Sequence, residues 1–443
     1  MADQSLESTV HRMLTLAISL HQEERLDEAE DIYRRVLDIA PRHSGALHFF
    51  GVIQHQRGDS ETAALLIRQA VKFDPDYHDA RVNLGNVLKE QGLFGEAENE
   101  YLKVVEAHPN NATARNNLGV VLKAQKKFEA AATEFEQATI LAPENRDAFQ
   151  NLGNALKACG RQEEALTAYR RALEIDPSRC DSHLVLGRTL NAFGRMDEAL
   201  SVYQKWLELE PDNPVAQHML NACDGAIVPE KCSEGFIQQT FDSFADSFNE
   251  VLEHLNYHAP ELVGRAVASL LSTHEELSVL DAGCGTGLCG KLLRDKASQL
   301  IGVDLSPKML DQAKAAKFYD QLIVAELTQY MQEQTAAFDL IVSADTLIYF
   351  GALSPVFQAA RKALRDDGAF IFTLEKEELG CDTTKFRLNP HGRYSHDEDH
   401  VKELLLEQGF RIDLFKVVVL RTEAGKPVDG LLIGARKSAE IDA

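Results

Sequence analysis

The sequence lacks a cysteine pattern and a long apolar segment. Its seven cysteines are odd in number and none lies in a Cys-x-x-Cys pair, so the sequence indicates neither a disulfide framework nor a metal site. No apolar run approaches about 20 residues, and the N-terminus has no signal-like apolar region, so we expect no membrane span. A reducing, cytoplasmic location is therefore predicted.

Positive charge is also scarce. The formal net charge is −23, and no local basic run offsets it. Proteins that bind nucleic acids usually present a basic face, and anionic membranes attract basic segments, so neither partner is expected. The length of 443 residues exceeds that of one ordinary domain, which predicts two or three domains.

The first half of the sequence repeats every 34 residues. Prolines keep this period from Pro41 to Pro211. Between them recur the glycines Gly51, Gly85, Gly119, Gly153 and Gly187, the alanines Ala29, Ala63, Ala97, Ala131, Ala165 and Ala199, and the large residues Tyr33, Ile67, Tyr101, Phe135, Tyr169 and Tyr203. A glycine that allows close approach, a small residue at the crossing and a proline after the second helix describe a helix pair.

This pattern resembles the tetratricopeptide repeat (TPR). About six repeats over residues 8–224 predict an α-solenoid that ends in a capping helix. The first repeat has Ala17 in place of glycine, and the last has Trp206 where a small residue is usual. Terminal repeats are often atypical in this way.

The resemblance implies a groove that binds a protein or peptide. Two rows of polar residues are candidates for its inner face, namely Asn83, Asn117 and Asn151, and Lys89, Lys123 and Lys157. Asparagine amides can form hydrogen bonds with a peptide backbone, and lysine can form an ion pair with a carboxylate. The alternative is that the asparagines support packing between repeats and the lysines solvate a helix.

Residues 225–277 are predicted to be a linker followed by helix. Four phenylalanines lie on or near one helical face, Phe236, Phe241, Phe244 and Phe248. The favoured interpretation is a helix packed on the next domain, and the alternative is a lid that covers a cofactor.

From residue 278 to 437 strands alternate with helices. Strands are predicted at 278–282, 299–304, 321–326, 338–344, 368–375, 411–421 and 428–437. Helices are predicted after the first strand, ending near residue 296, and at 354–365 and 397–408. The last two strands are joined by a turn and form an antiparallel hairpin.

The glycine turn after the first of these strands carries the chemistry. Gly285 to Gly290 satisfies the dinucleotide pattern G-x-G-x-x-G, which is a weak match when it stands alone. Asp281 precedes the turn, where an acid can bind an ammonium and would repel a pyrophosphate. Asp304 ends the next strand, where it can bind ribose hydroxyls. With the terminal hairpin, these acids favour S-adenosylmethionine over a nicotinamide dinucleotide.

On these motifs, residues 234–437 resemble a class I S-adenosylmethionine-dependent methyltransferase. The whole chain resembles bacterial proteins that join TPRs to such a domain. The predicted fold class is therefore α plus α/β, a TPR α-solenoid followed by a Rossmann-like seven-stranded sheet with an antiparallel terminal hairpin. The resemblance implies cofactor contacts from Asp281, Gly283, Gly285, Gly287, Asp304, Met309, Glu326, Leu327 and Ala344. For Met309 and Leu327, core packing is the alternative.

The methyl acceptor is expected beyond the carboxyl ends of the later strands. A sulfonium donor is reactive, so the protein mainly aligns the acceptor, and a base is needed only if the acceptor starts protonated. The candidate catalytic residues are Asp345, Tyr349, His391 and His396. The segment 389–396 is expected to be a loop before a helix, in which Arg393 could hold an acceptor carboxylate or phosphate. The alternative is that this loop caps the helix and is otherwise structural.

Motifs that are absent narrow the acceptor. The sequence has no Asn/Asp-Pro-Pro-Tyr, no Pro-Cys nucleophile and no iron–sulfur cysteine triplet. A small molecule, a carrier-bound acyl group or a protein side chain remains. Two other functions stay open, a scaffold that binds S-adenosylmethionine as a sensor without catalysis, and an NAD(P)-dependent oxidoreductase.

Overall fold

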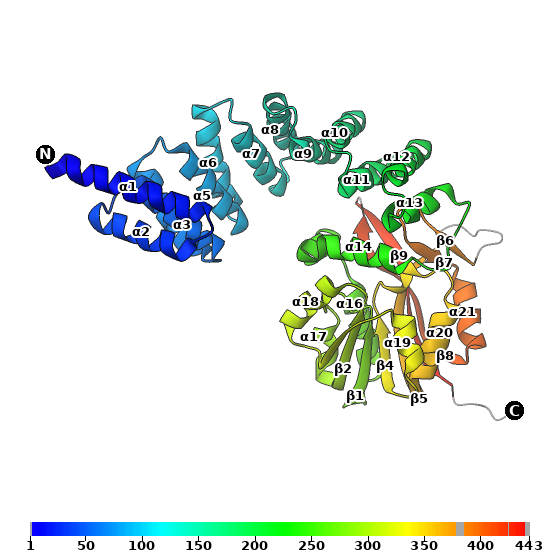
Figure 1. The fold of residues 1–443 in the computed structure, drawn as a ribbon. Helices are drawn as coiled ribbons and strands as arrows, with labels where there is room; N and C mark the ends of the chain where they lie inside the picture. The colour runs from blue at the N-terminus through cyan, green and yellow to red at the C-terminus, as the bar shows by residue number, and fades with distance from the viewer. Residues whose placement is uncertain (1, 378–384, 424, 439–443) are drawn as a thin grey trace. The chain divides into compact units, whose positions relative to one another are not determined.

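The computed structural model describes residues 2–377, 385–423 and 425–438 (Figure 1). The chain divides into two compact units, one that ends at Thr189 and one that begins at Leu190. The boundary lies within the predicted repeat region, so the last helices of that region belong to the second unit.

The first unit is built of antiparallel helix pairs. From α1 to α10 each helix contacts the next along the chain, so the pairs stack as the 34-residue period predicts. The helices are α1 (Ala2–Gln22), α2 (Leu26–Ile39), α3 (Ser44–Gln56), α4 (Ser60–Phe73), α5 (His78–Glu90), α6 (Phe94–Ala107), α7 (Ala112–Ala124), α8 (Phe128–Leu141), α9 (Arg146–Ala158) and α10 (Gln162–Ile175), and α11 (Cys180–Ala192) spans the boundary. The predicted α-solenoid is confirmed.

Packing inside each pair explains the period. A Cβ atom on Gly119 of α7 would lie 2.7 Å from the ring of Phe135 on α8. Because that ring is fully buried, only glycine leaves room for it. The start of α7 is also determined by a neighbouring residue, since the Asn111 side chain accepts a hydrogen bond from Ala114 N at 2.9 Å and caps the helix.

The second unit joins several helices to one large sheet. Its helices are α12 (Met196–Leu209), α13 (Pro214–Asp224), α14 (Glu234–Phe244), α15 (Phe248–His254), α16 (Ala259–Leu270), α17 (Gly290–Leu293), α18 (Pro307–Ala316), α19 (Leu327–Glu333), α20 (Ser354–Ala363) and α21 (Glu398–Glu407), with 3-10 turns η1 (Ala245–Ser247), η2 (Arg294–Lys296) and η3 (Leu347–Tyr349). Its strands are β1 (Leu277–Ala282), β2 (Ala297–Asp304), β3 (Gln321–Val324), β4 (Phe338–Ser343), β5 (Leu364–Lys376), β6 (Phe386–Leu388), β7 (Tyr394–His396), β8 (Phe410–Glu423) and β9 (Lys426–Lys437).

The sheet is doubly wound. Strands β3, β2, β1, β4 and β5 are parallel in that spatial order, and β9 pairs antiparallel with both β5 and β8. The terminal hairpin is therefore present as predicted. The strand order reverses between β1 and β4, and ligands of such sheets bind at the carboxyl ends of the strands beside this point.

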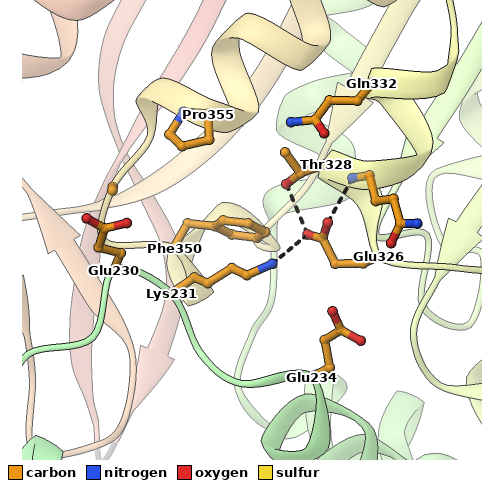
Figure 2. Close-up of a pocket in the computed structure, with 10 residues that line it drawn as sticks. Glu230, Lys231, Glu234, Glu326, Thr328, Gln332, Phe350 and Pro355 are labelled. Carbon is orange, nitrogen blue, oxygen red and sulfur yellow. Dashed lines mark hydrogen bonds and ion pairs between the residues drawn. The ribbon is translucent and has the colours of Figure 1, made fainter.

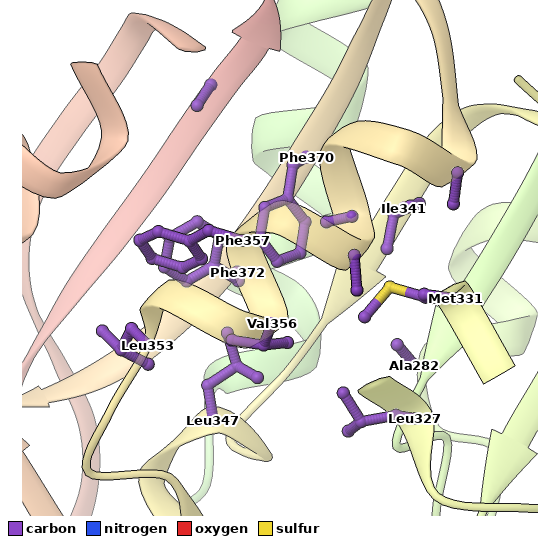
Figure 3. Close-up of a cluster of buried hydrophobic side chains, with 14 of the residues drawn as sticks. Ala282, Leu327, Met331, Ile341, Leu347, Leu353, Val356, Phe357, Phe370 and Phe372 are labelled. Carbon is purple, nitrogen blue, oxygen red and sulfur yellow. The ribbon is translucent and has the colours of Figure 1, made fainter. Parts of the chain in front are cut away.

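Hydrophobic side chains cover both faces of the sheet. Consecutive residues of β1 point to opposite sides, so Val279 joins a cluster with α16, whereas Leu280 joins a cluster with α19 and α20. Figure 3 shows the second cluster, in which the Phe357 ring lies 6.0 Å from that of Phe370 and 5.4 Å from that of Phe372. The sheet is thus a rigid support for the loops at its carboxyl edge.

Two segments differ from the sequence predictions. The helix expected to end near residue 296 is only the one-turn α17, followed by a 3-10 turn. The expected loop at 389–396 contains β7, which pairs with β6 and with the end of β5. These two strands extend the seven predicted ones, and each has only three residues, too few for an alternating pattern to show in the sequence.

Candidate active site

The glycine turn after β1 is hydrogen-bonded to the end of β2. Gly283 N donates to Val303 O at 2.8 Å, and Gly285 N donates to Asp304 Oδ2 at 2.9 Å. Gly283, Gly285 and Gly287 have φ values of 81°, 53° and 88°, which glycine adopts without a steric penalty. The turn and the tip of β2 therefore form one fixed unit.

The three glycines differ in the space around them. A Cβ on Gly283 would lie 2.2 Å from the Thr346 side chain, and one on Gly287 would lie 3.0 Å from the Tyr319 ring. A Cβ on Gly285 would meet no atom within 4 Å. The backbone at Gly285 is therefore open to an approaching ligand.

Asp281 is buried beneath this turn. Its Oδ2 accepts a hydrogen bond from the Tyr319 hydroxyl at 2.7 Å. Burial raises the pKa of Asp281 to about 7, and the bond from Tyr319 opposes that shift. Tyr319 was missed at the sequence level because its partner is 38 residues away, and no local pattern connects them. A carboxyl with this pKa ionises readily when a cation approaches.

Asp304 is held at the tip of β2 by backbone donors. Ser306 N donates to its Oδ1 and Gly285 N to its Oδ2, both at 2.9 Å. Burial raises the pKa of Asp304, and these bonds oppose the shift. Each carboxylate oxygen keeps a lone pair that can accept a further donor.

The helical segment 234–254 lies against the residues that flank the turn. The Ser306 hydroxyl donates to Asp242 Oδ1 of α14 at 2.5 Å, and the Thr286 hydroxyl donates to Asn249 Oδ1 of α15 at 2.8 Å. Its ring cluster also reaches η3, since the Phe241 ring lies 5.5 Å from that of Tyr349. The segment packs on the sheet domain at its predicted cofactor side.

The residues predicted at the adenine edge belong to α18 and α19. Met309 is 1% exposed and Leu327 is 7% exposed. Glu326 caps α19, because its Oε2 accepts from Gln329 N at 2.8 Å and its Oε1 from the Thr328 hydroxyl at 3.0 Å. The main role visible for Glu326 is therefore helix capping.

A cavity of about 430 Å³ opens beside Glu326 (Figure 2). Lys231 Nζ points at the carboxylate and lies 3.6 Å from Glu326 Oε1. Lys231 comes from the linker, which is fastened to η3 by Cys232 N donating to Tyr349 O at 2.9 Å. Phe350 and Pro355 also line the cavity. Sequence patterns do not identify Lys231, since nothing near it in the chain marks a site.

Ala344 and Asp345 follow β4 at the carboxyl edge of the sheet. Asp345 has a left-handed φ of 56°, and its backbone N donates to the Thr373 hydroxyl at 2.8 Å. Burial raises the pKa of Asp345. Its Oδ1 is buried and has no hydrogen-bond partner among the described residues, which is costly unless a ligand or water supplies a donor. Burial also raises the pKa of Tyr349.

Asp345 belongs to a largely buried network of two arginines and three acids. Arg421, 3% exposed, pairs with Asp345 Oδ2 at 2.7 Å, with Glu423 Oε1 at 2.6 Å and closely with Glu375. Arg393 lies 2.6 Å from both Glu375 Oε1 and Glu423 Oε1. Both guanidinium groups therefore already hold carboxylates of the protein.

The two candidate histidines lie in different surroundings. His391 Nε2 lies 3.6 Å from Glu375 Oε2, so it borders the network, and burial lowers the pKa of its ring. His396 is fully buried in β7, with Nε2 3.2 Å from Gly351 O. His391 is therefore close to Asp345 and its partners, whereas His396 is part of the strand packing.

Comparisons with known proteins agree with this architecture. A family model described as a methyltransferase domain matches residues 280–372, and tetratricopeptide repeat models match residues 14–146, 153–191 and 182–215. The chain is a fusion of TPRs with a methyltransferase domain. Together the matches include parts of both units and leave residues 216–279, which contain α14, α15 and α16, outside them.

Two curated relatives named as methyltransferases match part of the chain. An 18S rRNA (guanine-N(7))-methyltransferase of Bos taurus is 34% identical over 84 residues, which is 19% of this chain and 30% of the relative. A malonyl-[acyl-carrier protein] O-methyltransferase of Legionella pneumophila is 30% identical over 155 residues, 34% of this chain and 51% of the relative. The chain thus spans about half or less of the length of these relatives. Among solved structures, Pseudomonas aeruginosa pilF aligns with 48% of this chain and 97% of its own, at 21% identity and a TM-score of 0.42.

The last TPR helices dock on the methyltransferase domain within the second unit. His218 of α13 is buried, its Nε2 lies 2.8 Å from Gly392 O, and its ring stacks 3.9 Å from that of Phe236. Asn191 donates to Pro390 O at 3.1 Å. These contacts hold the turn that carries His391 and Arg393, so the repeat region supports the candidate acceptor side.

The predicted row of asparagines forms hydrogen bonds to the preceding repeat. Its contacts are Asn83 Nδ2 to His48 Nε2 at 2.7 Å, Asn117 Nδ2 to Asn86 Oδ1 at 3.1 Å and Asn151 Nδ2 to Asn116 Oδ1 at 3.3 Å. This is the geometry of the packing alternative, although each amide keeps a second N–H and its carbonyl oxygen. Burial lowers the pKa of Lys123. Lys89 is partly buried and Lys157 is exposed.

The described residues contain neither a candidate membrane span nor a candidate metal site. No helix there is long and apolar enough to cross a membrane. Within the same residues, no three His, Cys, Asp or Glu side chains are grouped so that they could hold a metal ion.

Proposed function

We propose that the methyltransferase domain uses S-adenosylmethionine as its methyl donor and methylates an acceptor that the TPRs help to recruit. The observation that carries this proposal is the open backbone at Gly285, set between two acids at the carboxyl ends of β1 and β2. A ligand with one ammonium and two vicinal hydroxyls satisfies such a site better than a pyrophosphate does. When bound, the cofactor supplies an activated methyl group.

The residues of the domain take separate roles in this proposal. Asp281 binds the ammonium and Asp304 binds the ribose hydroxyls, while Gly283 and Gly287 keep the turn in its left-handed conformation. Met309, Glu326 and Leu327 border the adenine, and Ala344 lies on the methyl side. Asp345, Tyr349 and His391 face the acceptor, and the proposal gives His396 no direct role because it is enclosed in β7.

The segment 234–254 acts as a cover in this proposal. Its hydrogen bonds to Thr286 in the glycine turn and to Ser306 just after β2 support this role. Exclusion of water protects the donor and lowers the local dielectric, which strengthens the electrostatic interactions of the site.

Two other functions make different predictions. A sensor would bind S-adenosylmethionine and yield no methylated product. An oxidoreductase would bind NADH, but Asp281 would lie where the pyrophosphate of a dinucleotide is expected and would oppose it.

The deciding measurement is binding followed by transfer. We expect calorimetry on the full chain to show binding of S-adenosylmethionine and not of NADH, with affinity reduced at least tenfold in Asp304→Ala and unchanged in Asp311→Ala, an exposed acid on α18. Methyl-labelled cofactor is then mixed with cell extract. Label in the protein fraction supports recruitment by the TPRs, and label only in small molecules contradicts it. Binding of NADH alone, or binding without any label, would replace this proposal with one of the alternatives.

A further inference from the structure

Among the described residues, the two arginines beside Asp345 are both already paired with carboxylates. Arg421 contacts Asp345, Glu375 and Glu423, and Arg393 contacts the last two of these. A negatively charged acceptor would have to displace these buried carboxylates from their partners. Breaking a buried charge pair in this way is strongly unfavourable.

The charges of this network also favour a hydrogen-bond donor over an anion as the acceptor group. Three carboxylates face two guanidinium groups, which leaves one negative charge in excess. His391 borders the network with its Nε2 3.6 Å from Glu375 Oε2, and burial and the neighbouring Arg393 lower the pKa of its imidazole. The network therefore repels anions and attracts groups that carry hydrogen-bonding protons.

One atom shows where such a proton would bind. Asp345 Oδ2 pairs with Arg421 at 2.7 Å, whereas Asp345 Oδ1 is buried without a partner among the described residues. Asp345 immediately precedes Thr346, whose hydroxyl donates to Gly283 O at 3.1 Å. The unpartnered oxygen thus belongs to a residue adjacent to the cofactor turn, and its left-handed φ of 56° holds it there.

Resting on the proposed function, we infer that the methyl acceptor is an amine or a hydroxyl group whose proton is bound by Asp345 Oδ1, and is not a carboxylate. The acceptor lone pair forms the new bond to the methyl carbon. The carbon–sulfur bond of the donor breaks and its electron pair passes to sulfur. The proton of the acceptor passes to Asp345 Oδ1, and Arg421 remains paired with the other oxygen. O-methylation of a malonyl group, as in the name of the Legionella relative, would instead present a carboxylate.

The first test reads the chemical stability of the product. Full-length protein and methyl-labelled S-adenosylmethionine are incubated with cell extract, and the labelled fraction is treated with mild base. Methyl esters of carboxylates hydrolyse to volatile methanol, whereas N-methyl amines and methyl ethers survive. We expect the label to stay non-volatile and to lie on nitrogen or oxygen by fragmentation. Volatile label, or label on sulfur or carbon, would overturn the inference.

The second test separates the acceptor from the cofactor. Asp345→Asn keeps the shape of the side chain and removes the proton acceptor. We expect its affinity for S-adenosylmethionine to stay within about twofold of the parent, while labelling falls at least a hundredfold, the range of a lost general base. Asp367→Asn is the matched control, because Asp367 also has a left-handed φ, of 58°, and pairs with Arg436 away from the network.

A marked loss of cofactor affinity in Asp345→Asn would show that Oδ1 serves the cofactor, and would overturn the inference while leaving the proposed function intact. Unchanged labelling in that variant would overturn it as well. Failure of the parent protein to bind S-adenosylmethionine would instead remove the proposed function. Thermal unfolding of both variants checks that each is folded.

Discussion

Glycines in the two units serve different physical purposes. In the TPRs, Gly119 lies inside a helix, and its missing side chain makes room for the Phe135 ring of the facing helix. In the methyltransferase domain, Gly285 lies in a left-handed turn, and its missing side chain leaves space that the protein does not fill. The first position contributes to packing, and the second, under the proposed function, gives a ligand access to the backbone; the residue type alone does not reveal which role a glycine has.

The largest effect should come from the packed position. We expect Gly119→Ala to lower the stability of its repeat by about 2 kcal/mol, because the new Cβ would lie 2.7 Å from the Phe135 ring. Hydrogen exchange should show faster opening of α7 and α8. Phe135→Leu in the same chain should restore much of the protection. Unchanged exchange in the single variant would contradict the packing account.

The open position should affect binding more than stability. We expect Gly285→Ala to reduce affinity for S-adenosylmethionine at least tenfold, about 1.4 kcal/mol, because its Cβ would occupy the space left for the cofactor. The left-handed φ should cost about 1 kcal/mol of stability. Gly425→Ala, also at a positive φ with no neighbour within 4 Å, controls for that strain. Equal affinities in both variants would show that the space at Gly285 is not used.

The smallest effect concerns the acid under the turn. Burial raises the pKa of Asp281 to about 7, so the carboxyl is protonated at lower pH and must lose that proton to bind an ammonium. We expect affinity to rise by up to about tenfold between pH 6 and 8 and to level off above that. Without ligand the sign is opposite, since a raised pKa contributes stability at low pH that is lost as pH rises through about 7.

Calorimetry across this pH range checks the prediction. Asp281→Asn should bind more weakly with little dependence on pH. A parent profile that is flat from pH 6 to 8 would separate Asp281 from the ammonium. The comparison of the two glycines would then be sharper, because Gly285 would lie beside a buried acid, Asp281, whose role is only structural.

Periodic and local features were accessible from the sequence. The 34-residue period predicted the solenoid because each repeat forms the same packed pair, and the buried strands of the sheet stood out as apolar runs. The three-residue strands β6 and β7 did not, since their positions depend on pairing with the end of β5. The partners of Asp281 and Asp345 were also hidden, because Tyr319 and Arg421 are 38 and 76 residues away from them.

The contact between His218 and Gly392 has a consequence for how this fusion can be divided. Helix α13, which ends the repeat region, contacts the turn that carries His391 and Arg393. The boundary between the two compact units therefore falls between residues 189 and 190 and not at the end of the repeats. The methyltransferase domain and the repeat array are therefore not freely exchangeable modules. Any exchange of the array between related proteins should retain the final repeat, because its helices pack on the methyltransferase domain.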